Sequence, residues 1–309
     1  MIYTRSYEIL QQIFHNFLTF FGNIVYIINN EILIAKFQNF KEVLFMSNAI
    51  YYFTGTGNSL AVAKSLALDL GDTVLINIKE KQTEFNASGY ERVGFVFPVY
   101  YYYLPIIVEN FIKQMSFGRE QYIFGVCTYG GMRGDALGSL RKLICEKGAD
   151  LNAEFSVIMP GNYIVEYGAI AEPINNLILA KSKKTMSKIS KVIKQKQNTN
   201  PAGLRTFEKV YLDRKNSRKN IEDIRNSFNI IDKGFSVNKN CNGCGICEKI
   251  CPVGNIELLD GQPQWQHKCE QCMACIQWCS KKSIDYLGKT KKRRTYHHPE
   301  VTLGEMLNP

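Results

Sequence analysis

The sequence predicts an α/β protein: a doubly wound parallel sheet of five strands, followed by basic helices and a small α+β domain rich in cysteine. Three observations support this prediction. Short apolar segments alternate with amphipathic helical segments from about residue 49 to residue 160. A strongly basic stretch comes next, and eight of the ten cysteines then fall within residues 241–279. The 309 residues are 45% apolar, which is enough for more than one domain.

The first 45 residues contain neither a secretory signal nor a convincing membrane span. The longest nearly apolar run, Phe17 to Ile28, is interrupted by Thr19, Gly22 and Asn23. It is too short and too polar to cross a bilayer, and no small-residue cleavage site follows it. We therefore expect a cytoplasmic protein whose thiols are reduced or bound to metal, because disulfides are rare in that compartment.

The same residues raise the question of where translation starts. The segment KEVLF stands just before Met46, and Lys-Glu-Val can be encoded by AAG-GAG-GTN, which contains a bacterial ribosome-binding sequence. We favour the hypothesis that residues 1–45 are a mis-called extension and that the protein begins at Met46. The alternative is an amphipathic N-terminal helix that lies on a membrane or packs on the body of the protein. Codons AAA-GAA at this place would remove the main support for the first hypothesis.

The predicted sheet begins with the apolar run Ala49–Phe53, which has the composition of a buried parallel strand. From Ser59 the apolar residues recur on one helical face, and Gly71 ends the helix. Alternation then continues to residue 160 and predicts helices on both faces of a parallel sheet, whose ligands bind at the carboxyl ends of the strands. The further strands are expected at 73–78, 92–99, 121–131 and 153–160, and the further helices at 105–115 and 134–148.

The turn between the first strand and the first helix reads Thr54-Gly55-Thr56-Gly57-Asn58-Ser59. Such a turn directs backbone N–H groups and the positive end of a helix toward an anion. The dinucleotide fingerprint requires a third glycine where Leu60 stands, and the triphosphate P-loop requires a lysine before Ser59. The remaining hydroxyl and amide side chains suit one permanently held phosphomonoester. The simpler alternative is a helix capped by Asn58 or Ser59.

This turn resembles the first loop of the flavodoxin-like family, a Thr/Ser-x-Thr-Gly-Asn-Thr/Ser stretch that wraps the phosphate of FMN. Residues Thr54 to Ser59 match it position by position. The resemblance implies a flavodoxin-like fold and an FMN site. Three further loops at the expected carboxyl edge suit a flat ring, with Pro98, Tyr100, Tyr129, Gly130 and Gly131 as candidates for ring contacts. The third loop adds Asn162 and Tyr163.

Two cysteines lie outside the C-terminal runs, Cys127 in an expected strand and Cys145 in an expected helix. Both fit buried thiols better than catalytic ones.

The C-terminal cysteines form two runs with the same spacing, C-x2-C-x2-C-x3-C. This spacing is typical of bacterial ferredoxins with two 4Fe–4S clusters, in which each fourth cysteine ligates the other cluster. Zinc sites use C-x2-C pairs, which leaves the third and fourth cysteine of each run unexplained. Ser280 replaces the usual proline after the second run. The ferredoxin pattern implies one cluster on Cys241, Cys244, Cys247 and Cys279, and a second on Cys269, Cys272, Cys275 and Cys251.

A basic stretch lies between these parts. Residues 181–220 contain thirteen lysines or arginines and two acidic residues. We expect a long basic helix over about 175–196 and a second helix that runs to about Ile231. This charge is either a solvated helix face or a docking face for an acidic redox partner. No helix-turn-helix or zinc-finger pattern accompanies it, so nucleic acid is not an expected partner. His297 and His298 are expected at the surface rather than among the metal ligands.

From Met46 onward the chain resembles the flavodoxin–ferredoxin fusion proteins of anaerobic bacteria. The resemblance implies a flavodoxin-like domain at 46–170, a basic helical linker at 171–235, a two-cluster ferredoxin domain at 236–290 and a basic tail at 291–309. It implies an electron-transfer iron–sulfur flavoprotein that relays electrons between FMN, its clusters and a redox partner. One alternative is an FMN-dependent reductase of a small substrate, fed by its own clusters. Another is a redox sensor whose basic helices bind a regulatory partner.

Overall fold

The computed structural model describes residues 24–28, 31–35, 48–79, 85–214 and 217–308. The chain divides into two compact units, residues 1–45 and residues 46–309. In the first unit, strands β1 (Ile24–Ile28) and β2 (Glu31–Ala35) pair in antiparallel fashion. The other residues of this unit lie outside the described part of the chain, so the hypotheses of a mis-called extension and of an N-terminal helix both stay predictions.

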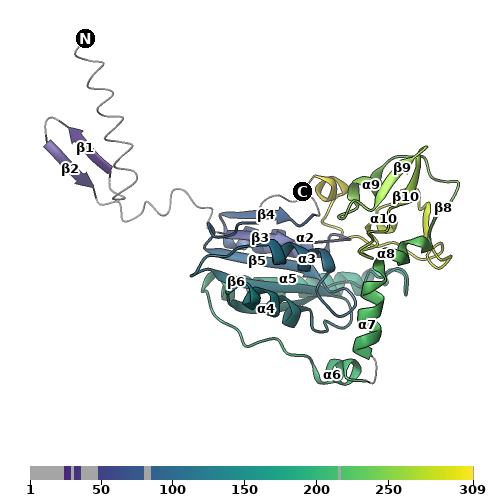
Figure 1. Cartoon of the computed structure of the whole chain (residues 1–309), viewed down its shortest axis with the longest axis horizontal. Helices are drawn as coiled ribbons and strands as arrows, with labels where there is room; N and C mark the ends of the chain where they lie inside the picture. Colours follow the sequence, from purple (N-terminus) through teal and green to yellow (C-terminus); the bar gives the residue numbers. More distant parts are fainter. Residues whose placement is uncertain (1–23, 29–30, 36–47, 80–84, 215–216, 309) are drawn as a thin grey trace, which may run out of the picture. The chain divides into compact units, whose positions relative to one another are not determined.

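The second unit is built on a five-stranded sheet with the order β4-β3-β5-β6-β7 (Figure 1). All four neighbouring pairs are parallel. This is the order 2-1-3-4-5 of the flavodoxin-like fold, so the predicted fold class is confirmed. The strands are β3 (Asn48–Tyr52), β4 (Thr73–Asn77), β5 (Arg92–Pro98), β6 (Tyr122–Tyr129) and β7 (Leu151–Ile158).

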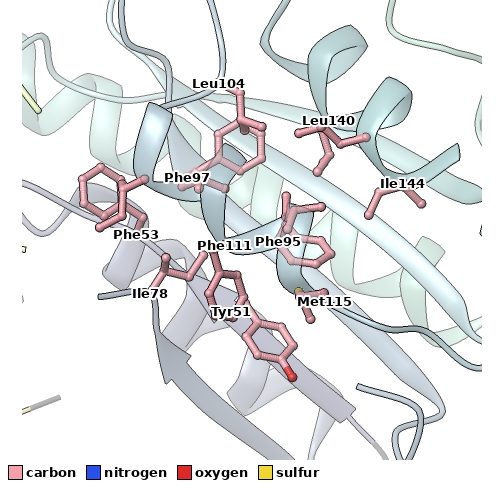
Figure 2. Packing of buried hydrophobic residues seen from close by; sticks show 14 of the residues in the cluster. Tyr51, Phe53, Ile78, Phe95, Phe97, Leu104, Phe111, Met115, Leu140 and Ile144 are labelled. Carbon is pink, nitrogen blue, oxygen red and sulfur yellow. The ribbon is translucent and has the colours of Figure 1, made fainter. Parts of the chain in front are cut away.

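Helices α3 (Ile106–Gln114) and α4 (Ala136–Glu146) cover one face of this sheet. The aromatic rings of Tyr51, Phe95 and Phe111 meet beneath them (Figure 2). The ring centroids of Tyr51 and Phe95 are 5.7 Å apart, and those of Tyr51 and Phe111 are 5.4 Å apart. Leu140 and Ile144 of α4 are fully buried in the same cluster. Burial of each such side chain contributes about 1.5–3 kcal/mol to the stability of the fold. This packed layer therefore supports the sheet edge on which the site is built.

Helices α2 (Asn58–Leu70) and α5 (Glu172–Lys194) cover the opposite face. Helix α5 was expected in a linker, but Met186, Ile189 and Ile193 are buried in the core of this face. Its basic residues therefore lie on the outer side of a helix that belongs to the α/β layer. Leu177 was included in the predicted apolar face, yet it is 63% exposed because it lies off the buried face that Asn175, Leu179 and Ser182 form.

The second basic helix is not continuous. The described chain forms α6 (Thr206–Leu212), α7 (Ser217–Asn226) and α8 (Phe228–Ile231) in its place. The cysteine-rich part follows as two small antiparallel sheets, β8 with β11 and β9 with β10, together with the short helices α9 and α10 (Figure 1). Its elements are β8 (Phe235–Val237), α9 (Ile246–Ile250), β9 (Ile256–Leu259), β10 (Gln262–Trp265), α10 (Ala274–Gln277) and β11 (Ile284–Tyr286), and α11 (Leu303–Leu307) ends the described chain.

The two cysteines outside the C-terminal runs differ in their surroundings. Cys127 is fully buried on β6, as expected, and burial raises the pKa of its thiol to about 12. Cys145 was also expected to be buried, but it is exposed on α4 because it lies on the side of that helix facing away from the sheet.

In the described part of the chain, no helix has both the length and the apolar character needed to cross a membrane.

Candidate functional site

A cleft of about 710 Å³ opens at the carboxyl ends of the parallel strands. This volume lies within the usual range for sites that bind small molecules and cofactors. The loops after β3, β5, β6 and β7 all contribute to its walls, as the sheet order requires. The predicted Gly57 does not line the cleft. Of the residues predicted from the sequence, those that line it are Thr54, Gly55, Thr56, Asn58, Ser59, Pro98, Tyr100, Tyr129, Gly130, Gly131, Asn162 and Tyr163.

The turn before α2 presents the start of that helix to the cleft. Gly57 is the N-cap residue and has a φ of 90°, a conformation that side chains with a Cβ disfavour. No side chain caps the helix, so the alternative of a helix capped by Asn58 or Ser59 is wrong. An uncapped helix start with buried polar side chains around it is a suitable place for a phosphate.

The polar side chains of this turn bind the neighbouring loops. The Asn58 amide donates to the carbonyl oxygen of Pro160 over 3.1 Å, and the hydroxyls of Ser59 and Thr128 are 2.9 Å apart. Thr54 accepts a hydrogen bond from the Gly57 N–H at 3.0 Å. These contacts fix the loops after β6 and β7 around the helix start. These side chains were expected to bind the phosphate themselves. Because they are already bonded to neighbouring groups, their main part is to position the backbone of the turn.

A segment near the C-terminus covers the same turn from the other side. The backbone N–H of His298 donates to the Thr56 carbonyl oxygen over 2.8 Å, and the Tyr296 hydroxyl donates to Asn58 Oδ1 over 2.8 Å. His298 was expected at the surface, but only 3% of it is exposed, and burial lowers the pKa of its ring to about 4. His297 is exposed and stacks on Trp278 with ring centroids 4.4 Å apart. No local sequence pattern indicates that this C-terminal segment covers the turn.

The loop after β5 brings three consecutive tyrosines, Tyr100 to Tyr102, to the cleft. Tyr101 and Tyr102 have φ values of 46° and 67°, which are strained for residues other than glycine. The Tyr101 hydroxyl is hydrogen bonded to that of Tyr163, which also lines the cleft. Burial is the main cause that raises the pKa of both hydroxyls, so both stay protonated near neutral pH.

The loops after β6 and β7 approach each other closely at the cleft. A Cβ on Gly130 would lie 2.6 Å from the Cα of Gly161, which leaves room only for glycine. Tyr129 is 6% exposed, and the guanidinium carbon of Arg205 stands 5.2 Å from the centre of its ring. Tyr129 is therefore held by Arg205, which lies just before α6. The sequence did not predict this contact.

The first cysteine set surrounds a second, smaller cavity. Cys241, Cys244, Cys247 and Cys279 all line it, together with other residues of the same two segments and with Leu258 and Pro263 of the β9–β10 hairpin. The pKa of Cys247 is raised to about 11, by burial first and then by the neighbouring Cys244 and Cys279. The pKa of Cys279 is lowered: burial opposes ionisation, but hydrogen bonds from Ser283 and nearby backbone groups outweigh it.

The second cysteine set is more deeply buried. Burial, followed by the proximity of Cys251 and Cys269, raises the pKa of Cys272 well above its usual value. The same causes act on Cys275. Backbone N–H groups donate to two sulfurs of this set, from Asn255 to Cys251 over 3.2 Å and from Gln271 to Cys269 over 3.3 Å. Thus Cys251, from the first run, lies with cysteines of the second.

In the described part of the chain, no three His, Cys, Asp or Glu side chains are grouped closely enough to hold a single metal ion. The cysteines of the first set surround a cavity instead. Four thiols around one cavity fit the ligand set of an iron–sulfur group.

The second cysteine set and the large cleft share a wall. Cys272 lines the cleft, and a Cβ on Gly55 would lie 2.6 Å from the Cys272 carbonyl oxygen and 2.9 Å from the Tyr100 hydroxyl. The Trp278 indole donates to the Gly55 carbonyl oxygen over 3.1 Å. The buried Glu270 accepts a hydrogen bond from the Ile107 N–H at 2.8 Å, and burial raises its pKa to about 7. The turn before α2 is therefore packed directly against the cysteine-rich part.

Comparison with known proteins agrees with this fold. The family model described as a flavodoxin domain matches residues 49–200. Among solved structures, a Fusobacterium nucleatum flavodoxin bound to flavin mononucleotide shares 15% identity over 47% of this chain and 96% of its own, with a TM-score of 0.32.

Two further structures show a similar level of likeness. A flavoprotein from Lactobacillus acidophilus in complex with FMN shares 11% identity over 36% of this chain and 92% of its own, with a TM-score of 0.30. Megasphaera elsdenii flavodoxin shares 16% identity over 36% and 85%, with a TM-score of 0.31. No match is found among curated proteins.

Proposed function

We propose that the protein is an electron-transfer iron–sulfur flavoprotein of the flavodoxin–ferredoxin fusion type. FMN would occupy the large cleft, and two 4Fe–4S clusters would be held by the two cysteine sets. The observation that carries this proposal is the position of Cys272, which belongs to the second cysteine set and also lines the cleft. A ligand of one redox group would thus form part of the binding site of the other.

The chain's own residues have separate tasks in this proposal. The uncapped start of α2, positioned by Thr54 and Asn58, would bind the phosphate. Tyr100 and Tyr129 would contact the flavin ring. When bound, FMN exchanges one or two electrons and each cluster exchanges one. The hydroxyl of Tyr100 lies beside Gly55, as does the Cys272 carbonyl oxygen, and it would help to keep water out of the space between the two sites.

The cysteine sets would hold the clusters with ligands from both runs. Two contacts support this: Cys251 lies near Cys269 and Cys272, and Cys279 lines the cavity of Cys241, Cys244 and Cys247. An exchange of the fourth ligand between the two runs would be the ferredoxin arrangement. Eight thiols kept for metal require a reducing compartment, which is consistent with the cytoplasm.

Anaerobic purification followed by iron, sulfide and flavin analysis tests this proposal. We expect eight irons, eight sulfides and one FMN per chain. Cys251→Ala should disturb the cluster built mainly from the second run, although Cys251 itself belongs to the first run. Bound zinc without sulfide would overturn the iron–sulfur assignment. Absence of FMN from a protein with eight irons would overturn the flavin assignment alone.

A second function is favoured by one specific observation. Tyr101 and Tyr163 form a hydroxyl pair in the cleft, and both hydroxyls are protonated near neutral pH. In an FMN-dependent reductase, such a pair could donate a proton to a small substrate at the flavin. Tyr163→Phe should then slow substrate reduction at least tenfold while flavin reduction by the donor is unchanged. Equal rates in both steps would favour the electron carrier.

A further inference from the structure

The two cysteine sets differ in their access to solvent and to the cleft. No cysteine of the first set lines the cleft, and Cys244 of that set is exposed. In the second set Cys275 is buried and Cys272 contributes to the wall of the cleft. The second set is therefore the one near the flavin site, and the first set is the one that faces outward.

Lysines gather beside the outward-facing set. Lys239, Lys281 and Lys282 are exposed, and Lys281 lines the cavity of the first set. Asn238 connects the two lysine-bearing segments by two hydrogen bonds. Its backbone N–H donates to the Ser283 carbonyl oxygen over 2.9 Å, and its side-chain amide donates to the Lys282 carbonyl oxygen over 3.3 Å. The segments 239–247 and 279–284 contain no acidic residue.

Exposed acidic side chains stand on another edge of the same cavity, at the β9–β10 hairpin. Leu258, which lines it, is flanked by the exposed Glu257 and by Asp260 on the β9–β10 hairpin. Glu248 faces inward and accepts a hydrogen bond from the Leu258 N–H at 3.0 Å. The surface around the first set is thus divided into a lysine side and an acidic side, which would orient a charged partner.

We infer that the surface formed by Lys239, Lys281, Lys282 and the exposed Cys244 is the docking site for an acidic one-electron carrier protein, and that electrons pass between this surface and the cleft by way of the second cysteine set. The inference rests on the proposed function. It replaces α5, the basic helix on which docking was expected, as the docking face. On α5, Lys183 is already paired with Glu300 of the C-terminal segment.

The exchange is balanced one electron at a time. A reduced carrier is oxidised as the group on the first cysteine set is reduced, and no bond is made or broken. Two such transfers supply the two electrons of one fully reduced flavin, and its protons come from solvent. The same path serves electrons that leave the cleft for an oxidised carrier.

The experiment compares two variants of the holoprotein with equal change in charge. Lys281→Glu with Lys282→Glu alters the proposed surface, and Lys184→Glu with Lys188→Glu alters α5, where both lysines are exposed. The probe is a purified acidic ferredoxin, and its Kd is measured at low salt and across a salt series. We expect the first variant to raise the Kd at least tenfold at low salt, an effect that fades as salt rises, and the second to change it less than twofold.

The opposite ranking, or equal effects of the two variants, would overturn the inference. Iron, sulfide and flavin content are measured in each preparation. A wild-type protein without clusters would overturn the proposed function, whereas a fully loaded protein with an unchanged Kd in the first variant would overturn only the docking site.

A cysteine variant tests the order of transfer. Cys244→Ala removes one thiol of the first set, and we expect four irons and one flavin to remain. Flavin reduction by the carrier should then fall at least tenfold while the Kd stays within twofold of the wild-type value. Reduction at the wild-type rate in a four-iron preparation would show that electrons enter elsewhere. If the variant does not fold, the lysine pair still decides the docking site.

Discussion

The buried ring of His298 should make the closure of the turn before α2 depend on pH. The pKa of this ring is lowered from 6.5 to about 4, chiefly by burial. Its Nδ1 accepts a hydrogen bond from the Glu300 N–H at 3.2 Å, which protonation would break. The closed segment therefore binds fewer protons than the opened one, where the ring meets water. Closure should be fully stable above pH 6.5 and should weaken as the pH falls toward 4.

The magnitude follows from these two pKa values. Between pH 7.5 and pH 5.5 the equilibrium constant for opening should rise about tenfold, or about 1.3 kcal/mol. The nearby carboxylates do not change this result. Lys183 lowers the pKa of Glu300, and Lys64 with Thr302 lowers that of Glu305 to about 2, so both stay ionised over this range.

Amide hydrogen exchange of the peptide that covers residues 296–302 measures this opening. After correction for intrinsic exchange, we expect protection to fall about tenfold from pH 7.5 to pH 5.5. His298→Asn keeps a hydrogen-bond acceptor but cannot titrate, so its protection should stay constant. His297→Asn changes the exposed neighbour and should keep the wild-type pH dependence. An equal loss of protection in the wild type and in His298→Asn would refute the reasoning.

Three further substitutions and one control substitution test the fold and the site. Gly57→Val should lose FMN but keep eight irons in metal analysis, because the new Cβ meets Val301 at 3.0 Å and the backbone has a φ of 90°; full flavin content would contradict the assignment. Leu140→Ala should lower the free energy of unfolding by about 2–5 kcal/mol in denaturant titration, whereas Leu68→Ala, 85% exposed, should change it little. Glu154→Ala should cost about 2 kcal/mol or more by leaving Arg141 unpaired, which a thermal melt would detect.

Local sequence patterns predicted the parts of the protein that depend on neighbouring residues. The strands, the helices α2 to α4 and the turn Thr54–Ser59 follow from alternation of apolar segments and from glycine spacing. The two cysteine runs are equally local. The continuous second helix was wrong because residues 197–231 are too polar to show where helices break, and their ends depend on contacts such as that of Glu208 with the Arg133 N–H at 2.8 Å.

Contacts between distant segments could not be predicted in this way. The wall formed by Gly55 and Cys272 joins residues more than two hundred positions apart, and neither carries a signal for the other. The burial of His298 has the same origin, since a His-His pair in a basic tail looks like a surface segment. Cys145 was misplaced because a helix of mixed polarity does not reveal which of its small residues face the sheet.

The turn before α2 binds residues from three later segments of the chain. Asn162 from the loop after β7 donates to the Thr56 hydroxyl, Trp278 of the cysteine-rich part binds Gly55, and His298 of the C-terminal segment binds Thr56. The buried clusters on the two faces of the sheet also include residues of these later segments, Val253 in one cluster and Trp278 and Val301 in the other. The outer side of the turn packs against Trp278 of the cysteine-rich part and His298 of the C-terminal segment. The cleft is thus completed by the same contacts that bring Cys272 to its wall, and the position of the turn is coupled to that of the second cysteine set.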